Sequence, residues 1–430
     1  MKTMIVVILI CMLLLFLLKV PVYISMALTG CALMVATSGM KWSILTQYLY
    51  TGTNSFTLLA IPLFLLAAKL MNTGGITKKL FAFCMKVVGW LPGGLGHVNI
   101  LSSVIFAGMS GTAVSDAGGL GAIEIKAMNE NGFDNDFSCC VTAASSTMGP
   151  IIPPSIPLVV YATVSGASVG ALFMAGIVPG IVMALLMMVV VTIYAIKRHY
   201  PRTKFPTFHE FGHALKEGFL PLMAPIILLV GIYGGVFTPT ESAAIVVLYS
   251  LFLDVVVYRE LSFKKFIAIL KETVRDSLTI ALIIAGATFF GYVATRAKIP
   301  QMILTSMTSV VSSKITLLLI INVFLLIVGC FLETASAITI VVPLILPLLT
   351  AYNINLTQFG IIMVLNLMIG LLTPPFGLVL FVISKIGHIS IGRFSKALVP
   401  WLGALLAALL LVTFIPQLSL WFPTMLGMSV

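Results

Sequence analysis

Long apolar segments separated by short polar loops run along the whole of this chain. The clearest are residues 3–18, 55–68, 98–115, 172–196, 219–236, 242–257, 277–294, 315–332 and 397–416. A helix needs about 20 mostly apolar residues to cross the ~30 Å hydrocarbon core of a bilayer, so such segments predict membrane spans. With shorter and proline-interrupted segments included, the sequence predicts an all-α integral membrane protein with about eleven to thirteen full or partial crossings.

Composition excludes a soluble fold. Of the 430 residues, 60% are hydrophobic and 9% are charged, which is more apolar side chain than one soluble core can bury. The formal net charge of +11 is also found in nucleic-acid-binding proteins, but here the basic residues lie in short loops between apolar runs. That distribution indicates positive-inside topology. We therefore expect contact with the lipid bilayer and none with nucleic acid.

An internal repeat is the strongest organisational signal. The run Met148–Pro154 aligns with Ile369–Pro375, so that Pro153-Pro154 matches Pro374-Pro375 at an offset of 374 − 153 = 221. The same gapless frame makes four further matches, which pair Gly149 with Gly370, Gly166 with Gly387, Phe173 with Phe394, and Pro179 with Pro400. Five matches in one frame predict two related halves.

Basic residues predict that the two halves have opposite orientations. Helix 172–196 is followed by basic residues, which place its C-terminal end in the cytoplasm, whereas the matching helix 393–417 has them at its start. Inverted repeats of this kind are typical of secondary transporters, with substrate and ion sites near the bilayer midplane. The predicted parts are an N-terminal half (1–196), a cytoplasmic polar linker (197–218) and a C-terminal half (219–430).

The proline clusters predict broken helices. Proline removes a backbone donor and clashes with the preceding turn, and unpaired backbone in a membrane costs several kcal/mol per group. We predict two re-entrant helical hairpins, at about 137–171 and about 334–392, beside about eleven transmembrane helices. The predicted tips offer oxygen atoms to a cation and half-helix N-termini to an anion, and they comprise Ser145, Ser146, Thr147 and Gly149 in one hairpin and Asn366, Gly370 and Thr373 in the other. Close helix packing by small residues is the alternative interpretation.

Three carboxylates, Asp116, Glu241 and Glu333, lie in otherwise uncharged stretches. Each costs several kcal/mol inside a membrane unless it is paired or hydrated, so each is a candidate functional acid. The alternative, which the sequence leaves open, is an acid that caps a broken helix near Thr238 or Thr334.

One motif favours a different class of protein. His209-Glu210-Phe211-Gly212-His213 has the H-E-x-x-H pattern of zinc metalloproteases, in which two histidines bind the metal and the glutamate activates water. The motif lies in the basic linker without an obvious third ligand, so we expect no zinc and no enzymatic activity. A P-loop pattern is also absent from the sequence, so energy must come from a gradient or another subunit.

Five short motifs occur in an order and spacing that resemble a known family. They are Ile61–Phe64, Gly108–Ala113, Ile152–Ile156, Phe237–Glu241 and Gly370–Pro375. Over almost its entire length the chain resembles the large membrane (M, DctM-like) subunit of tripartite ATP-independent periplasmic (TRAP) transporters.

The resemblance implies a sodium-coupled importer of an organic acid, such as sialic acid or a C4-dicarboxylate, across the bacterial inner membrane. It implies an elevator mechanism, a heterodimer with a small membrane subunit, a periplasmic substrate-binding protein as donor, and Na⁺ as coupling ion without another cofactor. It adds Ser110 and Thr334 to the sodium-binding candidates; the substrate-binding candidates are Ser145, Pro153, Ser155, Thr373 and Pro374. Glu333 stands where some relatives have Asp. The alternatives are a stand-alone sodium/anion symporter, a passive channel and, from the other class, an intramembrane zinc protease.

Overall fold

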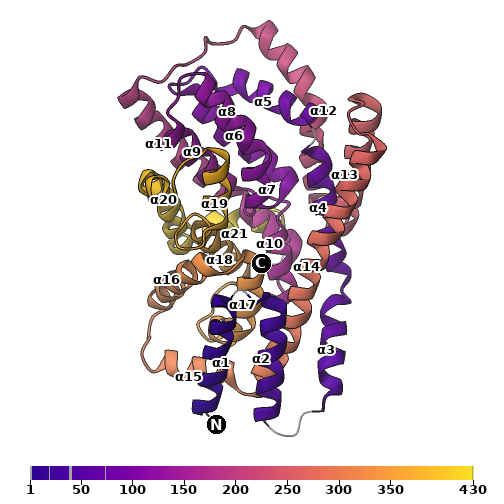
Figure 1. The fold of residues 1–430 in the computed structure, drawn as a ribbon, viewed down its shortest axis with the longest axis vertical. Helices are drawn as coiled ribbons and strands as arrows, with labels where there is room; N and C mark the ends of the chain where they lie inside the picture. Colours follow the sequence, from indigo (N-terminus) through magenta and orange to yellow (C-terminus); the bar gives the residue numbers. More distant parts are fainter. Residues whose placement is uncertain (1, 19, 38–40, 73, 429) are drawn as a thin grey trace.

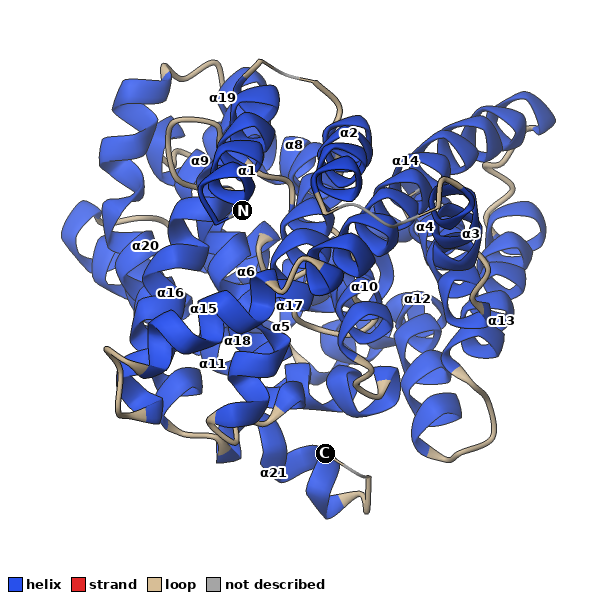
Figure 2. Cartoon of the chain, turned by 90° about the horizontal axis from the view of Figure 1, so that it is seen from below, coloured by secondary structure: helices blue, strands red, loops and turns tan. Residues whose placement is uncertain are grey.

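The computed structural model describes residues 2–18, 20–37, 41–72, 74–428 and 430, and within these ranges it contains helices and no strand (Figures 1 and 2). The helices are α1 (Lys2–Leu17), α2 (Val22–Ala36), α3 (Ser43–Thr53), η1 (Phe56–Leu59), α4 (Ala60–Met71), α5 (Gly74–Val88), α6 (Gly94–Ser110), α7 (Ala113–Gly118), α8 (Leu120–Glu130), α9 (Asn135–Ser146), α10 (Ile156–Ser165), α11 (Val169–Arg198), α12 (Phe208–Tyr233), α13 (Pro239–Phe252), η2 (Leu253–Val257), α14 (Phe263–Arg296), α15 (Ile299–Thr308), α16 (Lys314–Phe331), α17 (Thr334–Ala351), α18 (Leu356–Gly370), α19 (Leu378–Ile386), α20 (Ile391–Phe414) and α21 (Gln417–Met425).

Membrane-spanning helices dominate this fold. By length and composition, seven described helices can cross a bilayer alone, or eight if α3 and η1–α4, which meet at a bend of 53°, count as one span. Four further apolar helices of 10–17 residues are too short to cross alone at 1.5 Å per residue. The all-helical multispan fold is confirmed, and several predicted crossings are short or broken helices.

The repeat extends to the helix boundaries. Helix α6 ends at Ser110 and α16 ends at Phe331, and 110 + 221 = 331. Likewise α9 begins at Asn135 and α18 at Leu356, and 135 + 221 = 356. In the same frame α2 corresponds to α13 with η2, α3 and α4 to α14, α5 to α15, α7 and α8 to α17, α10 to α19 and α11 to α20. The two halves therefore share one order of elements.

Both Pro-Pro segments are broken spans. Arg198 Nη1 at the end of α11 donates a hydrogen bond to Asp134 Oδ2 just before α9 (2.6 Å), whereas α10 ends just before α11 begins. Helices α9 and α10 together therefore cross the length of the 30-residue α11. In the second half, Gln358 near the start of α18 donates to the Val412 carbonyl near the end of α20 (3.0 Å), and α19 ends just before α20 begins. These segments differ from the predicted hairpins at 137–171 and 334–392.

Two other segments form the re-entrant hairpins. Gly93, just before α6, lies against Ala195 near the end of α11, and α8 ends just before α9 on that same side, so α6, α7 and α8 enter and leave together. At the other side, Lys314 at the start of α16 donates to the Asn353 carbonyl just after α17 (3.1 Å). The first hairpin turns at Gly111, whose φ of +63° suits glycine, and the second turns at Leu332.

The helices form two groups that exchange elements between the halves. In the scaffold group, α2 and α3 pack on α14 and α13 packs on α4. In the core group, α9 packs on α20, α11 on α18, α10 on α17 and α7 on α19 (Figure 1). Basic residues at the end of α11, near the top of Figure 1, indicate that this end faces the cytoplasm. The hairpin turns lie between the two groups.

Candidate functional site

A cavity of about 780 Å³ lies between the scaffold group and the two hairpin turns. The first turn contributes Thr112 and Ser115, and the second contributes Glu333 and Ser336. These are corresponding positions, since 112 + 221 = 333 and 115 + 221 = 336. The cavity is therefore built where the two repeats meet.

The four polar side chains at these turns share one local structure. Thr112 caps α7 by accepting a hydrogen bond from the Ser115 backbone N–H to Oγ1 (3.3 Å). Glu333 caps α17 by accepting from the Ser336 backbone N–H to Oε2 (3.2 Å). Such caps satisfy backbone donors that a helix start leaves unpaired. One turn is therefore capped by a neutral hydroxyl and the other by a carboxylate.

In the first half, Ser145 lies in a buried hydrogen-bonded network. Its hydroxyl donates to Asn99 Oδ1 (2.7 Å) and accepts from Ser103 (2.9 Å), while Asn99 Nδ2 donates to Thr142 Oγ1 (2.7 Å). All four residues are buried. The network fixes α9 against α6 directly before the break at 147–155.

The other first-half candidates bond their own segment. The Ser146 and Thr147 hydroxyls donate to carbonyls one turn earlier (2.8 and 2.6 Å), and Ser155 donates to the Pro150 carbonyl while capping α10. Pro153 forms a cis peptide bond with the next residue. The side chain of Ser110 lies outside the described part of the structure.

Gly149 lies against the carboxylate of Asp116. A Cβ atom on Gly149 would be 2.6 Å from Asp116 Oδ2, so the break in α9–α10 and the α7 segment pack closely here. The break between α9 and α10 also contacts the first hairpin turn through the backbone, since the Ile156 N–H donates to the Gly111 carbonyl (3.4 Å). The structure thus joins the predicted proline break to a hairpin turn that was not predicted.

In the second half, Asn366 occupies the position that corresponds to Ser145. Its Nδ2 donates to Asn322 Oδ1 (2.8 Å), and Asn322 Nδ2 donates to Thr413 Oγ1 (3.0 Å). The Asn366 Oδ1 atom is buried and has no hydrogen-bond partner among the described residues. A buried acceptor of this kind can bind a cation.

The remaining second-half candidates lie around the same break. A Cβ atom on Gly370 would be 2.4 Å from the Gly329 carbonyl carbon, so α18 and α16 cross in backbone contact. Thr373 donates to the Ile369 carbonyl (2.9 Å), Thr334 is buried, and Pro374 forms a cis peptide bond with the next residue. The predicted sodium-binding residues with described side chains therefore form two groups, one in each half. None of the five predicted substrate-binding residues lines the 780 Å³ cavity.

The intramembrane acids have different surroundings. Asp116 is buried, and Glu333 lines the cavity. Glu241 is exposed and forms a capping box with Thr238, whose N–H donates to Glu241 Oε2 (2.7 Å), as the capping alternative describes. Sequence analysis missed a fourth acid, Glu124, which is 1% exposed, because Lys126 follows it in a stretch that was not free of charge.

The H-E-x-x-H segment begins helix α12. Glu210 closes a capping box with Thr207 and pairs with Lys86 (3.4 Å), and His209 is exposed. Among the described residues, no group of three His, Cys, Asp or Glu side chains is placed to hold a metal ion. The second part of the predicted linker, from Phe208, is therefore helical, and its glutamate caps the helix.

Comparison with known proteins identifies the family. Residues 9–418 match the sequence model of the tripartite ATP-independent periplasmic transporter, DctM component. The chain belongs to this family. It is 42% identical over 403 residues, 94% of each chain, to the sialic acid TRAP transporter large permease protein SiaM of Vibrio cholerae. It is 35% identical over 428 residues to the C4-dicarboxylate TRAP transporter large permease protein DctM of the same organism, with 95% of this chain and 94% of the relative covered.

A solved structure agrees on the fold alone. The Alcanivorax borkumensis YdaH transporter superimposes with a TM-score of 0.64 at 14% identity, covering 86% of each chain. Membership of the TRAP family confirms the predicted resemblance, a multi-pass protein of the inner membrane, and a transport protein rather than an enzyme.

Proposed function

We propose that this TRAP permease imports an organic acid across the inner membrane, coupled to sodium, together with a small membrane subunit and a periplasmic substrate-binding protein. The observation that carries the proposal is the cavity at which both hairpin turns meet, with Thr112 and Ser115 facing Glu333 and Ser336. A site at the junction of inverted repeats is where secondary transporters bind substrate and ions.

Oxygen atoms beside the two proline breaks support sodium coupling. Hard cations prefer hydroxyl, amide and carbonyl oxygens, and Ser145 and Asn366 place such groups at corresponding positions beside the two breaks. Asn366 Oδ1 adds a buried acceptor without a hydrogen-bond partner in the described chain. We assign one sodium ion to each half, held between the hydroxyl or amide and the backbone of the break.

The division into two helix groups supports an elevator movement. The core group carries both hairpins, and its α17 packs on α14 of the scaffold group. The substrate would bind in the cavity between the two hairpin turns. The acids named for the relatives, sialic acid and C4-dicarboxylates, supply the substrates to test first.

Proteoliposomes test this proposal. We expect uptake of sialic acid or succinate only when the chain is reconstituted with its small subunit, an inward sodium gradient and the cognate binding protein. Uptake by the chain alone would identify a stand-alone symporter. Uptake that is independent of sodium would refute the coupling.

Paired variants test the sodium assignment. Ser145→Ala and Asn366→Ala each remove an oxygen donor, so we expect the sodium concentration for half-maximal uptake to rise about tenfold, the effect of roughly 1.4 kcal/mol. His209→Ala is the matched control, because this exposed side chain lies far along the chain from both breaks. Unchanged sodium activation in both variants would contradict the assignment. Stoichiometric zinc that is lost in the His209→Ala control would instead support the protease alternative.

A further inference from the structure

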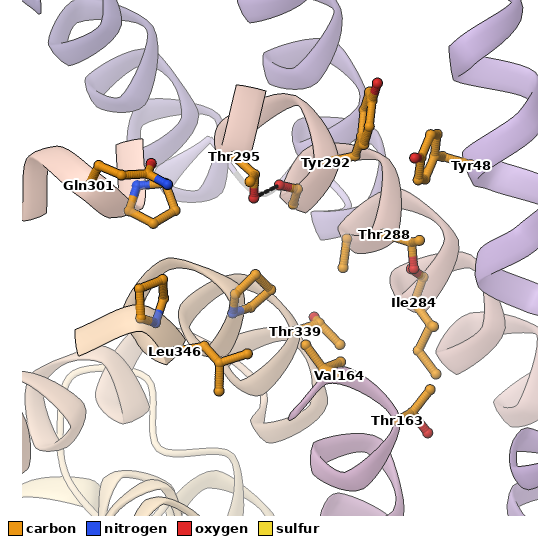
Figure 3. A pocket seen from close by; sticks show the side chains of 15 residues that line it. Tyr48, Thr163, Val164, Ile284, Thr288, Tyr292, Thr295, Gln301, Thr339 and Leu346 are labelled. Atoms are coloured by element: carbon orange, nitrogen blue, oxygen red, sulfur yellow. Dashed lines mark hydrogen bonds between the residues drawn. The ribbon is translucent and has the colours of Figure 1, made fainter. Parts of the chain in front are cut away.

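A second cavity, of about 480 Å³, lies on the opposite side of the hairpin turns. Its walls are α14 and α17, with the end of α10 below them, and Figure 3 shows Thr288 on α14 and Thr339 on α17 facing each other across it. Because α10 ends just before α11 begins, this cavity faces away from the cytoplasmic end of α11. Its volume is within the range of about 300–1,000 Å³ that small-molecule sites occupy.

The two cavities share their walls. On α14, Ile283 lines the first cavity and Ile284 lines the second, and on α17 the same holds for Ser336 and Thr339. Neighbouring faces of α14 and about one turn of α17 therefore separate a compartment on the periplasmic side from the compartment between the hairpin turns. A molecule in the second cavity lies directly before the proposed transport site.

Charge distinguishes the two compartments. The first cavity is lined by three carboxylates, Glu272, Asp276 and Glu333, and by Lys69, which pairs with the first two, so its lining keeps a net negative charge. The second cavity has no charged lining residue among those described. An anion therefore meets less repulsion in the second cavity. This difference favours an organic acid on the periplasmic side.

Uncharged polar groups line the second cavity, and acceptors are among them beside the donors of Tyr48, Tyr292 and Gln301. The Thr288 and Thr295 hydroxyls donate to carbonyls of their own helix (both 2.8 Å), which leaves oxygen lone pairs toward a ligand. Pro343 and Pro347 line the cavity and lack an N–H, so the carbonyls four residues before them receive no helical hydrogen bond from these positions. A ligand with several hydroxyl groups can donate to such acceptors, but a dicarboxylate cannot.

A cation lies at the edge of this cavity. Arg296 Nε donates to the hydroxyl of the lining residue Tyr292 (3.2 Å), and Arg296 pairs with no carboxylate among the described residues. It lies on the side where positive-inside topology expects few basic residues. A guanidinium in this place can bind the carboxylate of an arriving acid.

We propose that the cavity between α14, α17 and α10 is a periplasmic binding site for a hydroxyl-rich monocarboxylic acid, which it holds before the acid reaches the cavity between the hairpin turns. The acid's carboxylate contacts Arg296 and its hydroxyls donate to the acceptors of α14 and α17. This inference rests on the proposed function and names the substrate class: a sugar acid rather than a C4-dicarboxylate.

Cysteine labelling tests occupancy without requiring transport. In spheroplasts that carry the full chain with its small subunit, we expect a membrane-impermeant maleimide to label Gln301→Cys, which lines the cavity, and sialic acid or gluconate to slow the labelling at least fivefold. Val310→Cys is the matched control: Val310 is 82% exposed, does not line the cavity and should be labelled at one rate throughout. Succinate should protect neither position.

Equal protection by succinate, protection by none of the acids, or protection only by added phosphatidylglycerol, which would indicate a lipid site, would each overturn the inference. Loss of protection with sodium-driven uptake intact would leave the proposed function standing. Protection without any sodium-driven uptake would support the binding site and refute the proposed sodium-coupled import.

A charge variant tests the carboxylate contact. Arg296→Gln should raise the sialic acid concentration that gives half-maximal protection of Gln301→Cys about tenfold, because a charge-assisted hydrogen bond is lost. Lys298→Gln removes the same charge two residues further along the chain and should leave the sialic acid concentration for half-maximal protection unchanged. Equal effects of the two variants would show general electrostatic attraction and would overturn the assignment of Arg296.

Discussion

The hairpin turns of the two halves occupy corresponding positions but place their acids differently. In the first turn a threonine, Thr112, caps the helix, and the nearest acid along the chain, Asp116, is buried against Gly149. In the second turn the capping residue is itself an acid, Glu333, which lines the cavity. The two hairpins therefore share one backbone fold, but the carboxylate is buried in the first half and lines the cavity in the second.

The glycines at the breaks show a second difference. A side chain added at Gly149 would meet the Asp116 carboxylate, which can rotate away, whereas a side chain added at Gly370 would meet the backbone of Gly329, which cannot. The second-half crossing is therefore fixed by the main chain, and the first-half crossing by a movable side chain. We infer that the first half tolerates adjustment near its proposed sodium site and the second half does not.

Substitution of these two glycines should give the largest difference in effect between the two halves. In Gly370→Ala, the Cβ atom lies 2.4–2.7 Å from Gly329 backbone atoms, so α16 and α18 must separate. We expect a loss of at least ~1–3 kcal/mol in stability, the usual cost of overpacking. Gly149→Ala should cost less and should mainly change sodium activation. Thermal unfolding of the purified protein and sodium-dependent uptake measure the two effects.

A third glycine is the control for this pair. Gly403 in α20 has no atom within 4 Å of an added Cβ, so Gly403→Ala should be neutral or slightly stabilising because alanine favours helix. Equal destabilisation by the substitutions at Gly149 and Gly370 would contradict the distinction between a movable and a fixed crossing.

The sequence predicted the repeat and the positions of the proline breaks, but not the direction of the chain after each break. Proline states only that a helix stops, and the direction depends on what the next segment packs against. The hairpin turn at Gly111 depends on a positive φ that a glycine among many does not reveal. The offset of 221 did contain a usable signal, since it pairs Thr112 with Glu333 and Ser145 with Asn366.

Burial of the acids could not be predicted from local charge. Glu241 lies in an uncharged stretch yet is exposed, because it begins a helix at the protein surface. Glu124 lies near Lys126 yet is buried, because α8 turns only one face toward α6 and α9. The burial of an acidic side chain depends on which face of its helix is covered, and residues distant in sequence provide that cover.

Replacement of Glu333 by threonine would make the second turn resemble the first. Glu333→Thr keeps a capping oxygen, so we expect little change in thermal stability, whereas Glu333→Ala should lose ~1 kcal/mol. Both variants remove a carboxylate from the cavity and should raise the sodium concentration needed for half-maximal uptake several-fold. Thr112→Ser, which keeps the first cap neutral, is the control. Normal sodium activation in Glu333→Thr would show that this acid serves only as a cap.

The smallest difference is at the start of the broken spans, where Asp134 corresponds to Asn355, since 134 + 221 = 355. The Tyr200 hydroxyl (2.7 Å) and the Arg198 guanidinium (2.6 Å) hold the pKa of Asp134 below its ordinary value of 3.8, whereas Asn355 caps α18 without a charge. A lowered folded pKa means that this stabilisation is complete at neutral pH and is lost as the pH falls through that folded pKa.

The variant Asp134→Asn should therefore cost less than ~1 kcal/mol at pH 7, because the ion pair is largely exposed, and progressively less as the pH falls below the ordinary Asp value of 3.8. Asn355→Ala loses a cap and should lower the melting temperature by the same amount at every pH. Melting temperatures of the two variants and the unsubstituted chain across this range measure the contrast. An Asp134→Asn deficit that stays constant or grows on acidification would contradict the ion-pairing role of Asp134.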